Sequence, residues 1–433
     1  MARPNILFMT CHDLGQHLSC YGRQTVHSPA LDRLAGEGVL FEKSFCTAPQ
    51  CSPSRAALHT GRHAHSNGML GLAHRPFNWR LHDDEKHAAQ WLREAGYETA
   101  LWGVQHLTRT ADVARLGYDH YDADDPVAPA PIIAAQAAAF LRDPRRQDRP
   151  FYLEVGFFEP HRPYDYGGAP PDDSHGVEVP PYLDDTPQAR REFAALQGAI
   201  RRLDEGVGRI LAALEETGLD AHTWVIFAAD HGVAMPRAKC TLYDPGIATA
   251  LLMRWPTGGV GGGTRHGTLI SYVDVLPTLL EGLGLPVPAN LHGRSFWPLL
   301  QGQPYRPNDR IFAEKTYHTA YEPMRGIRTA AHKLIVNLEV DTKVNVPDDI
   351  REGAIYPTML PRLVGQRPCL ELYDLVNDPG ETINLAGKPE YRAVERDLKA
   401  QLIDWMRATD DPILDGAVAS PYHAAALAAL DDP

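Results

Sequence analysis

The residues with the clearest chemical potential lie in the run CSPSRAALHTGR, which begins at Cys51. Proline near its start and glycine near its end predict one short helix, with Cys51 at or just before the N-terminus and Gly61 as the stop. Unpaired N–H groups at a helix N-terminus favour an anion, and Arg55 adds positive charge one turn further along. A cysteine with a low pKa would be a nucleophile here. A buried cysteine beside a proline turn is the structural alternative.

Two predicted buried strands are each followed by one carboxylate and one imidazole. The apolar run at residues 5–11 leads to His12-Asp13, and the run at residues 223–229 leads to Asp230-His231. Polar residues just past the C-terminal ends of strands form ligand sites in open α/β sheets, so the two pairs would meet at one edge. This set predicts a divalent-cation site, although a turn or helix cap is the structural alternative for Asp13.

Three further side chains are candidates for chemistry on loops. His106 follows the strand predicted at residues 98–102, and His161 follows the strand predicted at residues 151–157. Lys239 lies on the segment after Asp230. Each has an ordinary alternative, because loop histidines are often only hydrogen-bonded and loop lysines are usually solvated.

These motifs, taken together and in order, resemble the sulfatase family. Sulfatases carry Cys-x-Pro-x-Arg followed by Thr-Gly-Arg, and their cysteine is oxidised after synthesis to formylglycine, an aldehyde whose hydrate is the nucleophile. The resemblance implies that a formylglycine-generating enzyme modifies Cys51. It also implies one divalent metal, held by His12, Asp13, modified Cys51, Asp230 and His231.

The resemblance covers nearly the whole chain and is closest to the heparan N-sulfatase (sulfamidase) group. The runs that carry this likeness are CSPSRA from Cys51, NGM at residues 67–69, TLYDPG at 241–246 and PMR at 323–325. It implies hydrolysis of a sulfamate or sulfate ester on a small sulfated saccharide.

The resemblance also implies a role for each loop residue. Arg55 and Lys239 would neutralise charge on the transferred group. His161, with Lys239, would protonate the departing amine or alcohol, and His106 would help the sulfated hydrate collapse to the aldehyde.

The sequence departs from the sulfatase pattern around the metal and the sulfate. His12 replaces an aspartate, His231 replaces an asparagine, and Val104 replaces a lysine that grips a sulfate oxygen. Calcium is the favoured metal because the family binds it, and imidazole ligands make manganese or zinc the alternatives. We expect His63, His74 or Arg325 to be able to supply the donor that Val104 lacks.

Two other functions stay open at this point. A phosphonate monoester hydrolase or phosphodiesterase of the same superfamily is favoured by Asp230-His231 and by the missing lysine. A metal-binding homologue without catalysis is the other, although a complete nucleophile signature has little purpose in a pure binder.

The alternation of strands and helices predicts an α/β fold. The resemblance implies an alkaline-phosphatase-like sandwich: a large, mostly parallel sheet flanked by helices, then a small antiparallel sheet with a terminal helix at residues 391–407. We place the catalytic domain at residues 1–308 and a smaller α+β subdomain at residues 309–433. The segment at 164–181, rich in Pro, Gly and Asp, is expected to form a substrate-side lid.

The composition excludes several classes of protein. The 433 residues are 44% hydrophobic and 22% charged, with a net charge of −13. No basic stretch suits nucleic acid, and no apolar run is long enough to span a membrane. The six cysteines show no paired spacing, and the start MARP leads directly into a strand. We therefore expect a cytoplasmic protein, and a homo-oligomer is compatible with the sequence.

Overall fold

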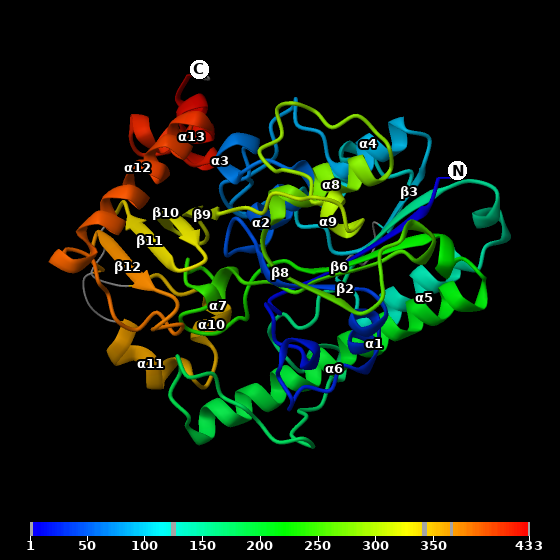
Figure 1. Cartoon of the computed structure of the whole chain (residues 1–433), viewed down its shortest axis with the longest axis horizontal. Coiled ribbons are helices and arrows are strands. Elements are labelled where there is room, and N and C mark those ends of the chain that lie inside the picture. The colour runs from blue at the N-terminus through cyan, green and yellow to red at the C-terminus, as the bar shows by residue number, and fades with distance from the viewer. Residues whose placement is uncertain (1–2, 123–126, 340–343, 364–366, 432–433) are drawn as a thin grey trace.

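The computed structural model describes residues 3–122, 127–339, 344–363 and 367–431, and its two sheets are seen in Figure 1. The larger sheet has eight strands in the order β4-β3-β5-β1-β6-β7-β2-β8. β7 is antiparallel to both of its neighbours and the other pairs are parallel, so the predicted mostly parallel sheet is confirmed. The strands are β1 Asn5–Cys11, β2 Val39–Phe45, β3 Glu98–Gly103, β4 His120–Tyr121, β5 Phe151–Gly156, β6 Thr223–Ala229, β7 Leu251–Arg254 and β8 Thr264–Ser271.

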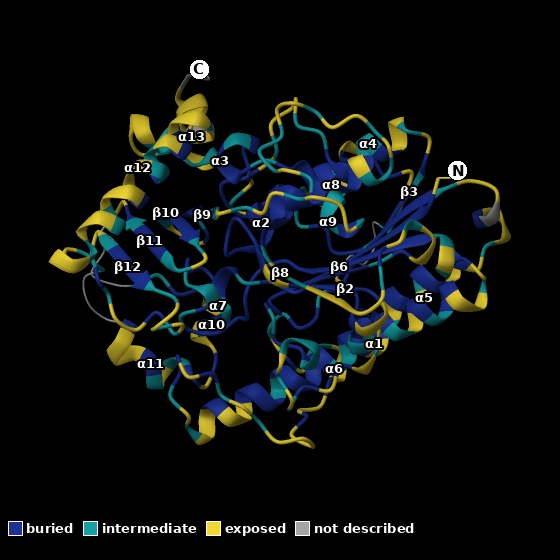
Figure 2. Cartoon of the chain, in the orientation of Figure 1, coloured by how far each residue is buried: buried dark blue, intermediate teal, exposed yellow. Residues whose placement is uncertain are grey.

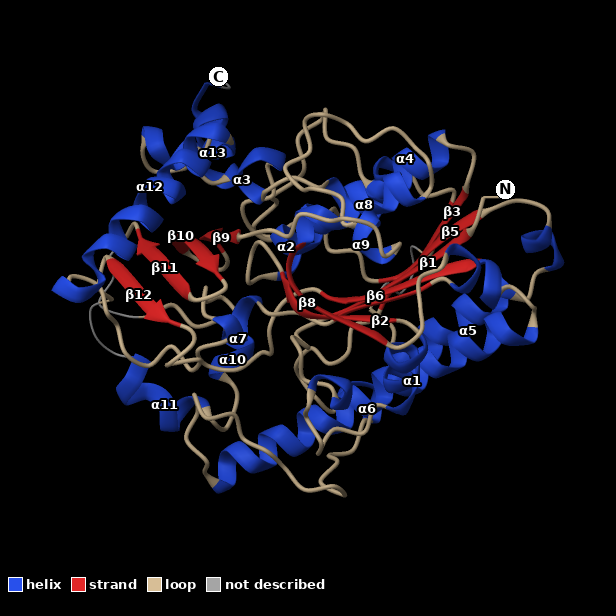
Figure 3. Cartoon of the chain, in the orientation of Figure 1, coloured by secondary structure: helices blue, strands red, loops and turns tan. Residues whose placement is uncertain are grey.

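Helices cover both faces of this sheet, as Figure 3 shows. Residues Leu7 and Met9 of β1 pack into the core on one face, and Ile6 and Phe8 pack into the core on the other. This is the alternation that a strand buried on both sides requires. One face carries α1 Pro29–Glu37, α5 Ala130–Leu141 and α6 Pro187–Glu216; the other carries α2 Cys51–Thr60, α4 Ala88–Glu94, α8 Val275–Gly282 and α9 Trp297–Leu300.

The smaller sheet has the order β12-β11-β10-β9 and is antiparallel throughout, as predicted. Its strands are β9 Arg310–Tyr317, β10 Tyr321–Thr329, β11 His332–Asn337 and β12 Leu370–Asp374. One face packs against α12, Arg392–Ala408, through Leu398 and Trp405. Short helices complete the described chain: α3 Ala64–Asn67, α7 Asp244–Ile247, α10 Asp348–Arg351, α11 Tyr356–Leu363 and the exposed α13 Pro421–Asp431.

The two sheets share one hydrophobic core. Met324 and Ile335, on the other face of the small sheet, belong to the same buried cluster as Ile6 and Phe8 of the large sheet. The first strand of the small sheet begins at Arg310, and the division at residues 308 and 309 stays a prediction. Among the described helices, none has the length and apolar character needed to cross a bilayer.

The segment expected to act as a lid packs mainly along α6. The Asp172 N–H donates to the Ala194 carbonyl at 2.8 Å, and Gln197 Nε2 donates to the Asp172 carbonyl at 2.6 Å. Only its first part borders the predicted site, where the Tyr166 ring lies 4.7 Å from Phe158. The loop around Asp172 is therefore held along α6, and the lid interpretation stays a prediction.

Candidate active site

Cys51 is the first residue of α2, at the C-terminal edge of the large sheet. Gln50 before it is extended, and Gly61, with φ of 67°, ends the helix in the left-handed conformation that favours glycine. The Cys51 side chain is 3% exposed, and its Sγ lies 3.4 Å from His231 Nε2. Burial raises the pKa of the Cys51 thiol well above its usual value. The low-pKa cysteine suggested by the helix position alone is therefore wrong for the unmodified thiol, because desolvation outweighs the helix terminus.

The two strand-end pairs meet because β1 and β6 are parallel neighbours. Cys11 lies opposite Ala229 in the register, which brings His12-Asp13 beside Asp230-His231. The backbone N–H groups of Asp13 and His231 both donate to Asp230 Oδ1, at 2.9 and 2.8 Å. Asp13 has a φ of 50°, a backbone conformation that is uncommon outside glycine and turns its side chain into the site.

One face of this cluster is arranged to hold a cation. His231 Nδ1 donates to the Gly232 carbonyl at 3.0 Å, so the lone pair of the neutral ring is on Nε2, which faces Cys51 Sγ at 3.4 Å. That Nε2 lies 3.1 Å from Asp13 Oδ1, a buried oxygen with no hydrogen-bond partner among the described residues. Asp13, Cys51 and His231 each offer an atom within 4.8 Å of the other two. A carboxylate, an oriented imidazole and a third ligand fit a divalent metal.

Arg55 is fully buried and is engaged with the sheet. Its Nε donates to Asp230 Oδ2 at 3.2 Å, its Nη1 to Thr10 Oγ1 at 2.8 Å and its Nη2 to the Cys11 carbonyl at 3.1 Å. The guanidinium therefore fixes Asp230 and the end of β1. Its predicted contact with the transferred group stays a prediction.

Lys239 lies between two carboxylates. Its Nζ donates to Asp13 Oδ2 at 2.9 Å and to Asp349 Oδ2 at 2.8 Å, and lies 3.5 Å from His161 Nε2. Burial acts to lower the pKa of Lys239, but Asp13 and Asp349 raise it well above its usual value. Lys239 is therefore a protonated side chain held at the centre of the site.

His161 faces the same ammonium as an acceptor. Its Nδ1 donates to the Arg162 carbonyl at 2.5 Å, so the lone pair of the neutral ring is on Nε2. Burial, followed by the charge of Lys239, lowers the pKa of His161. The structure thus brings His161 and Lys239 together as a proton-sharing pair.

Asp349 is a residue of the candidate site that the sequence analysis missed. It lies on the short helix α10, far along the chain from the other residues, and its side chain is 19% exposed. The charge of Lys239 holds its pKa well below the usual range, although burial opposes this. Its only sequence signal is a pair of acids after a proline, which is typical of any helix start.

His12 and His106 form the opposite side of the site. Their ring centroids are 4.7 Å apart with the ring planes at 81°. His12 Nδ1 lies 3.3 Å from Asp230 Oδ2, while His12 Nε2 and His106 Nδ1 are buried without a hydrogen-bond partner in the described chain. Burial, followed by the charge of Arg55, lowers the pKa of both rings well below its usual value.

Of the three side chains expected to compensate for Val104, only His74 lies nearby. Its ring centroid is 5.9 Å from that of His106. Arg325 is buried and donates to both oxygens of Asp411, at 2.5 and 2.8 Å. His63 stacks on His65 and lies edge-on to Trp405, away from the site. The expectation is therefore wrong for Arg325 and His63.

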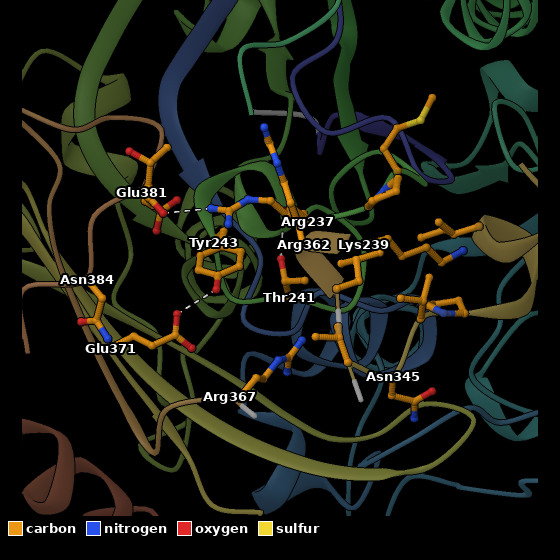
Figure 4. A pocket seen from close by; sticks show the side chains of 18 of the residues that line it. Arg237, Lys239, Thr241, Tyr243, Asn345, Arg362, Arg367, Glu371, Glu381 and Asn384 are labelled. Carbon is orange, nitrogen blue, oxygen red and sulfur yellow. Dashed lines mark hydrogen bonds between the residues drawn. The ribbon is translucent and has the colours of Figure 1, made fainter. Parts of the chain in front are cut away.

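Two hollows flank the candidate catalytic residues, and neither is lined by Cys51. The first, of about 300 Å³, is shown in Figure 4 and lies between Lys239 and the small sheet, with Arg237, Tyr243 and Arg367 in its wall. The second, of about 550 Å³, is lined by Val104 and His106 and by a rim of His74, Arg75 and Arg109. Both are large enough for a sugar ring, and both carry positive side chains.

A second histidine group lies in the core beneath α2. His59, His87 and Glu154 each offer an atom within 4.8 Å of the others. His87 Nδ1, however, accepts from the Ala89 N–H at 3.1 Å, so the neutral ring carries its proton on Nε2, the remaining nitrogen. This protonation opposes metal binding by His87, and we interpret the group as a buried polar network in which His59 Nε2 lies 3.3 Å from Glu154 Oε1.

The mixed sheet flanked by helices, followed by a small antiparallel sheet, is the alkaline-phosphatase-like fold. The family profile "Sulfatase" matches residues 4–285, and the profile "N-sulphoglucosamine sulphohydrolase, C-terminal" matches residues 236–352. The chain belongs to the sulfatase family, and is a hydrolase of sulfuric ester or S–N bonds.

Curated relatives align over most of their length. Human N-sulphoglucosamine sulphohydrolase is 29% identical, with 95% of this chain and 91% of the relative covered. An ulvan-active sulfatase of Formosa agariphila is also 29% identical, covering 97% of this chain and 83% of the relative.

Solved structures share the fold at lower identity. A chain in complex with its substrate, D-glucosamine-2-N,6-O-disulfate, superposes with a TM-score of 0.73 at 21% identity, covering 94% of this chain and 98% of that one. The phosphonate monoester hydrolase of Agrobacterium radiobacter superposes with a TM-score of 0.70 at 21% identity, covering 94% and 96%.

Proposed function

We propose that this chain is a formylglycine-dependent sulfatase that hydrolyses a sulfamate or sulfate ester on a sulfated saccharide. The observation that carries the proposal is the convergence of Asp13 Oδ1, His231 Nε2 and residue 51 at the start of α2, with the Lys239–His161 pair beside them. The sulfated glucosamine bound by the structural relative, and the name of the human relative, support the saccharide.

We propose that His12, Asp13, modified residue 51, Asp230 and His231 hold a divalent cation, calcium first and manganese or zinc as alternatives. Such an ion supplies Lewis-acid charge that lowers the pKa of a hydroxyl on residue 51. The oriented Nε2 of His231 and the unpartnered oxygen of Asp13 support this assignment.

Lys239 and His161 supply positive charge and a proton at the leaving group. Lys239 is protonated and lies within 3.5 Å of the lone pair of His161 Nε2. About one-fifth of the His161 side chain is exposed, so its Nε2 can take a proton from Lys239, which is left as the neutral amine, and pass that proton to the departing amine or alcohol. Arg55 keeps Asp230 in place from below.

A phosphonate or phosphate diester is the second candidate substrate. With Val104 in place of the family's lysine, the site lacks one cation that would bind a sulfate oxygen. Because a charged hydrogen bond contributes about 1.5–3 kcal/mol, sulfate binding should be weaker by about that amount. The fold shared with the phosphonate monoester hydrolase is compatible with this alternative.

Peptide mass mapping and parallel kinetics test the proposal. We expect the peptide with residue 51 to carry the aldehyde, and Cys51→Ala to be folded and inactive. We also expect kcat/KM on N-sulfoglucosamine or an aryl sulfate to exceed that on an aryl phosphonate ester. Full activity with an unmodified cysteine would refute the nucleophile, and a higher kcat/KM on the phosphonate would favour the second candidate.

A further inference from the structure

The hollow of about 550 Å³ beside Val104, called here the Val104 hollow, has an apolar floor and a positive rim. Leu101, Val104 and Val113 line it, and each is no more than 3% exposed. Val104 stands where the sulfatase pattern has a lysine, and the arginines of the hollow, Arg75 and Arg109, are on its rim. Positive charge is therefore placed at the mouth of the hollow and not on its floor.

Arg75 is a cation of this rim that no group of the protein neutralises. It is exposed, and no hydrogen bond, ion pair or ring contact joins its side chain to another residue in the described part of the chain. Arg109, in contrast, pairs with Asp112 at 2.9 Å. In a chain with a net charge of −13, an unpaired cation beside a hollow favours an anionic ligand at that place.

The other hollow, shown in Figure 4, differs because its arginines are already engaged. Arg362 Nη2 lies 2.8 Å from Asp184 Oδ1, and Arg367 Nη1 donates to Glu322 Oε1 at 2.7 Å. Arg237 donates to a backbone carbonyl at 2.9 Å. An anion that entered this hollow would have to displace these partners, whereas the Val104 hollow offers a cation with no partner to displace.

The backbone of the rim is held in place before any ligand binds. Arg75 lies in a turn in which the Phe77 N–H donates to the His74 carbonyl at 3.0 Å. Elsewhere in the lining, Gln105 Oε1 accepts from the Thr108 N–H at 2.9 Å, and its Nε2 donates to the Thr108 carbonyl at 2.7 Å. A preorganised rim lowers the entropic cost of binding.

The Val104 hollow is also close to the proposed proton donor. The His12 ring centroid is 4.7 Å from that of His106, which lines the hollow, and 5.5 Å from that of His161. A sugar whose departing nitrogen or oxygen is at His161 can therefore extend into the hollow.

We propose that the Val104 hollow binds the sugar unit of the substrate and that Arg75 binds a second anionic group on that saccharide, a carboxylate or a further sulfate. The substrate class is then a saccharide with at least two anionic groups, one hydrolysed and one only bound. This assignment rests on the proposed function and narrows its substrate. Arg75 is a specificity-determining residue, because it contacts the bound anion and no reacting atom.

Kinetics on matched saccharides test this assignment. The full-length wild type is compared on three sugars: the singly sulfated glucosamine, N- or 6-O-, that it hydrolyses faster, the N,6-disulfate, and a uronic acid disaccharide of that singly sulfated sugar. The second adds a sulfate and the third a carboxylate. We expect kcat/KM to be about 5- to 10-fold higher on at least one two-anion substrate, mainly through a lower KM. The preference should decrease as salt is raised, because Arg75 is exposed.

Two variants and a control assign the preference to one side chain. Arg75→Gln should lose the preference, and Arg75→Lys, which keeps the charge, should retain most of it. Arg362→Gln is the matched control, since it removes an exposed arginine from the other hollow and should keep the wild-type preference.

Equal kcat/KM on one-anion and two-anion substrates in the wild type would overturn the assignment and leave the proposed function intact, and this comparison needs no variant to fold. A preference that survives in Arg75→Gln, or one that is lost in Arg362→Gln, would overturn it as well. No turnover of any sulfated substrate, an aryl sulfate included, would overturn both the assignment and the proposed function.

Discussion

The hydrogen-bond donors of Lys239 are already engaged before a substrate binds. An ammonium has three N–H donors, and Asp13, Asp349 and His161 are the acceptors around this one. A substrate oxygen must therefore replace one of them. Asp349 comes from the separate helix α10 and is partly exposed, whereas Asp13 is wholly buried, so Asp349 holds Lys239 from the solvent side.

Asp349→Asn should lower kcat/KM by about 10- to 100-fold while leaving the fold intact. The amide keeps the shape but removes the charge that orients Lys239, and a charged hydrogen bond contributes about 1.5–3 kcal/mol. Steady-state kinetics check this, with Asp348→Asn, the adjacent and exposed acid, as the control. Unchanged kinetics would show that Asp13 alone positions the lysine.

Arg55→Lys should reduce both metal content and thermal stability. Lysine cannot make the three separate contacts of the guanidinium, and an incompletely paired Asp230 in the core costs about 3–5 kcal/mol. Melting temperature and bound metal are the measurements. Arg62→Lys, in the same signature but partly exposed, should change either quantity little; equal effects from the two variants would refute the assignment.

At the scale of elements, α4 begins at the buried His87, whose ring packs against α2. His87 is the N-cap of α4, where its Nδ1 accepts from Ala89, and its ring lies 4.5 Å from that of His59 on α2. Burial lowers the pKa of both rings to about 3. Both imidazole rings beneath α2 are therefore neutral at physiological pH.

This network predicts acid sensitivity. In the unfolded chain His87 titrates near 6.5, so between that pH and about 3 the unfolded state binds more protons and stability is lost as the pH falls. His87→Asn keeps a good N-cap and removes the titration. Below pH 6.5 we expect the free energy of unfolding of His87→Asn to fall less steeply with pH than that of the wild type. The difference in slope should be up to about 1.4 kcal/mol per pH unit. Denaturant unfolding at several pH values measures this, and parallel profiles for both proteins would contradict it.

At the scale of the whole molecule, the small sheet is joined to the large one by a common core and by charge. Asp244 on α7 accepts from Arg328 Nη2 at 2.9 Å and pairs with Lys333 Nζ at 2.6 Å, both from the small sheet. Lys333 also pairs with Glu381 at 2.7 Å. These contacts, with the buried Met324 and Ile335, predict that the halves unfold together.

The full chain should give one calorimetric transition, and residues 1–308 alone should not be soluble. Removal of the small sheet would expose the apolar face that Met324 and Ile335 now cover. Scanning calorimetry and expression of the shortened chain are the measurements. Two separate transitions, or a folded 1–308 fragment, would show that the parts on either side of the predicted boundary fold independently.

Much of the fold and part of the site were already determined by the sequence. Apolar runs such as residues 5–11 and 223–229 are long enough and uniform enough to be buried strands, and Gly61 ends α2 where the local pattern predicts. Parallel strands have their C-terminal ends at the same edge of a sheet. The local signals were therefore enough to predict that Asp13 and Asp230 lie close together.

Only the tertiary structure decided which groups satisfy one another. Asp349 lies beside Lys239 through packing of the C-terminal segment, and no local pattern encodes a contact between residues so far apart in sequence. The engagement of Arg55 and His12 with Asp230, and the unpartnered Nδ1 of His106, likewise depend on burial. Burial sets the cost of an unpaired polar group, and it is a property of the assembled core, which a linear sequence does not display.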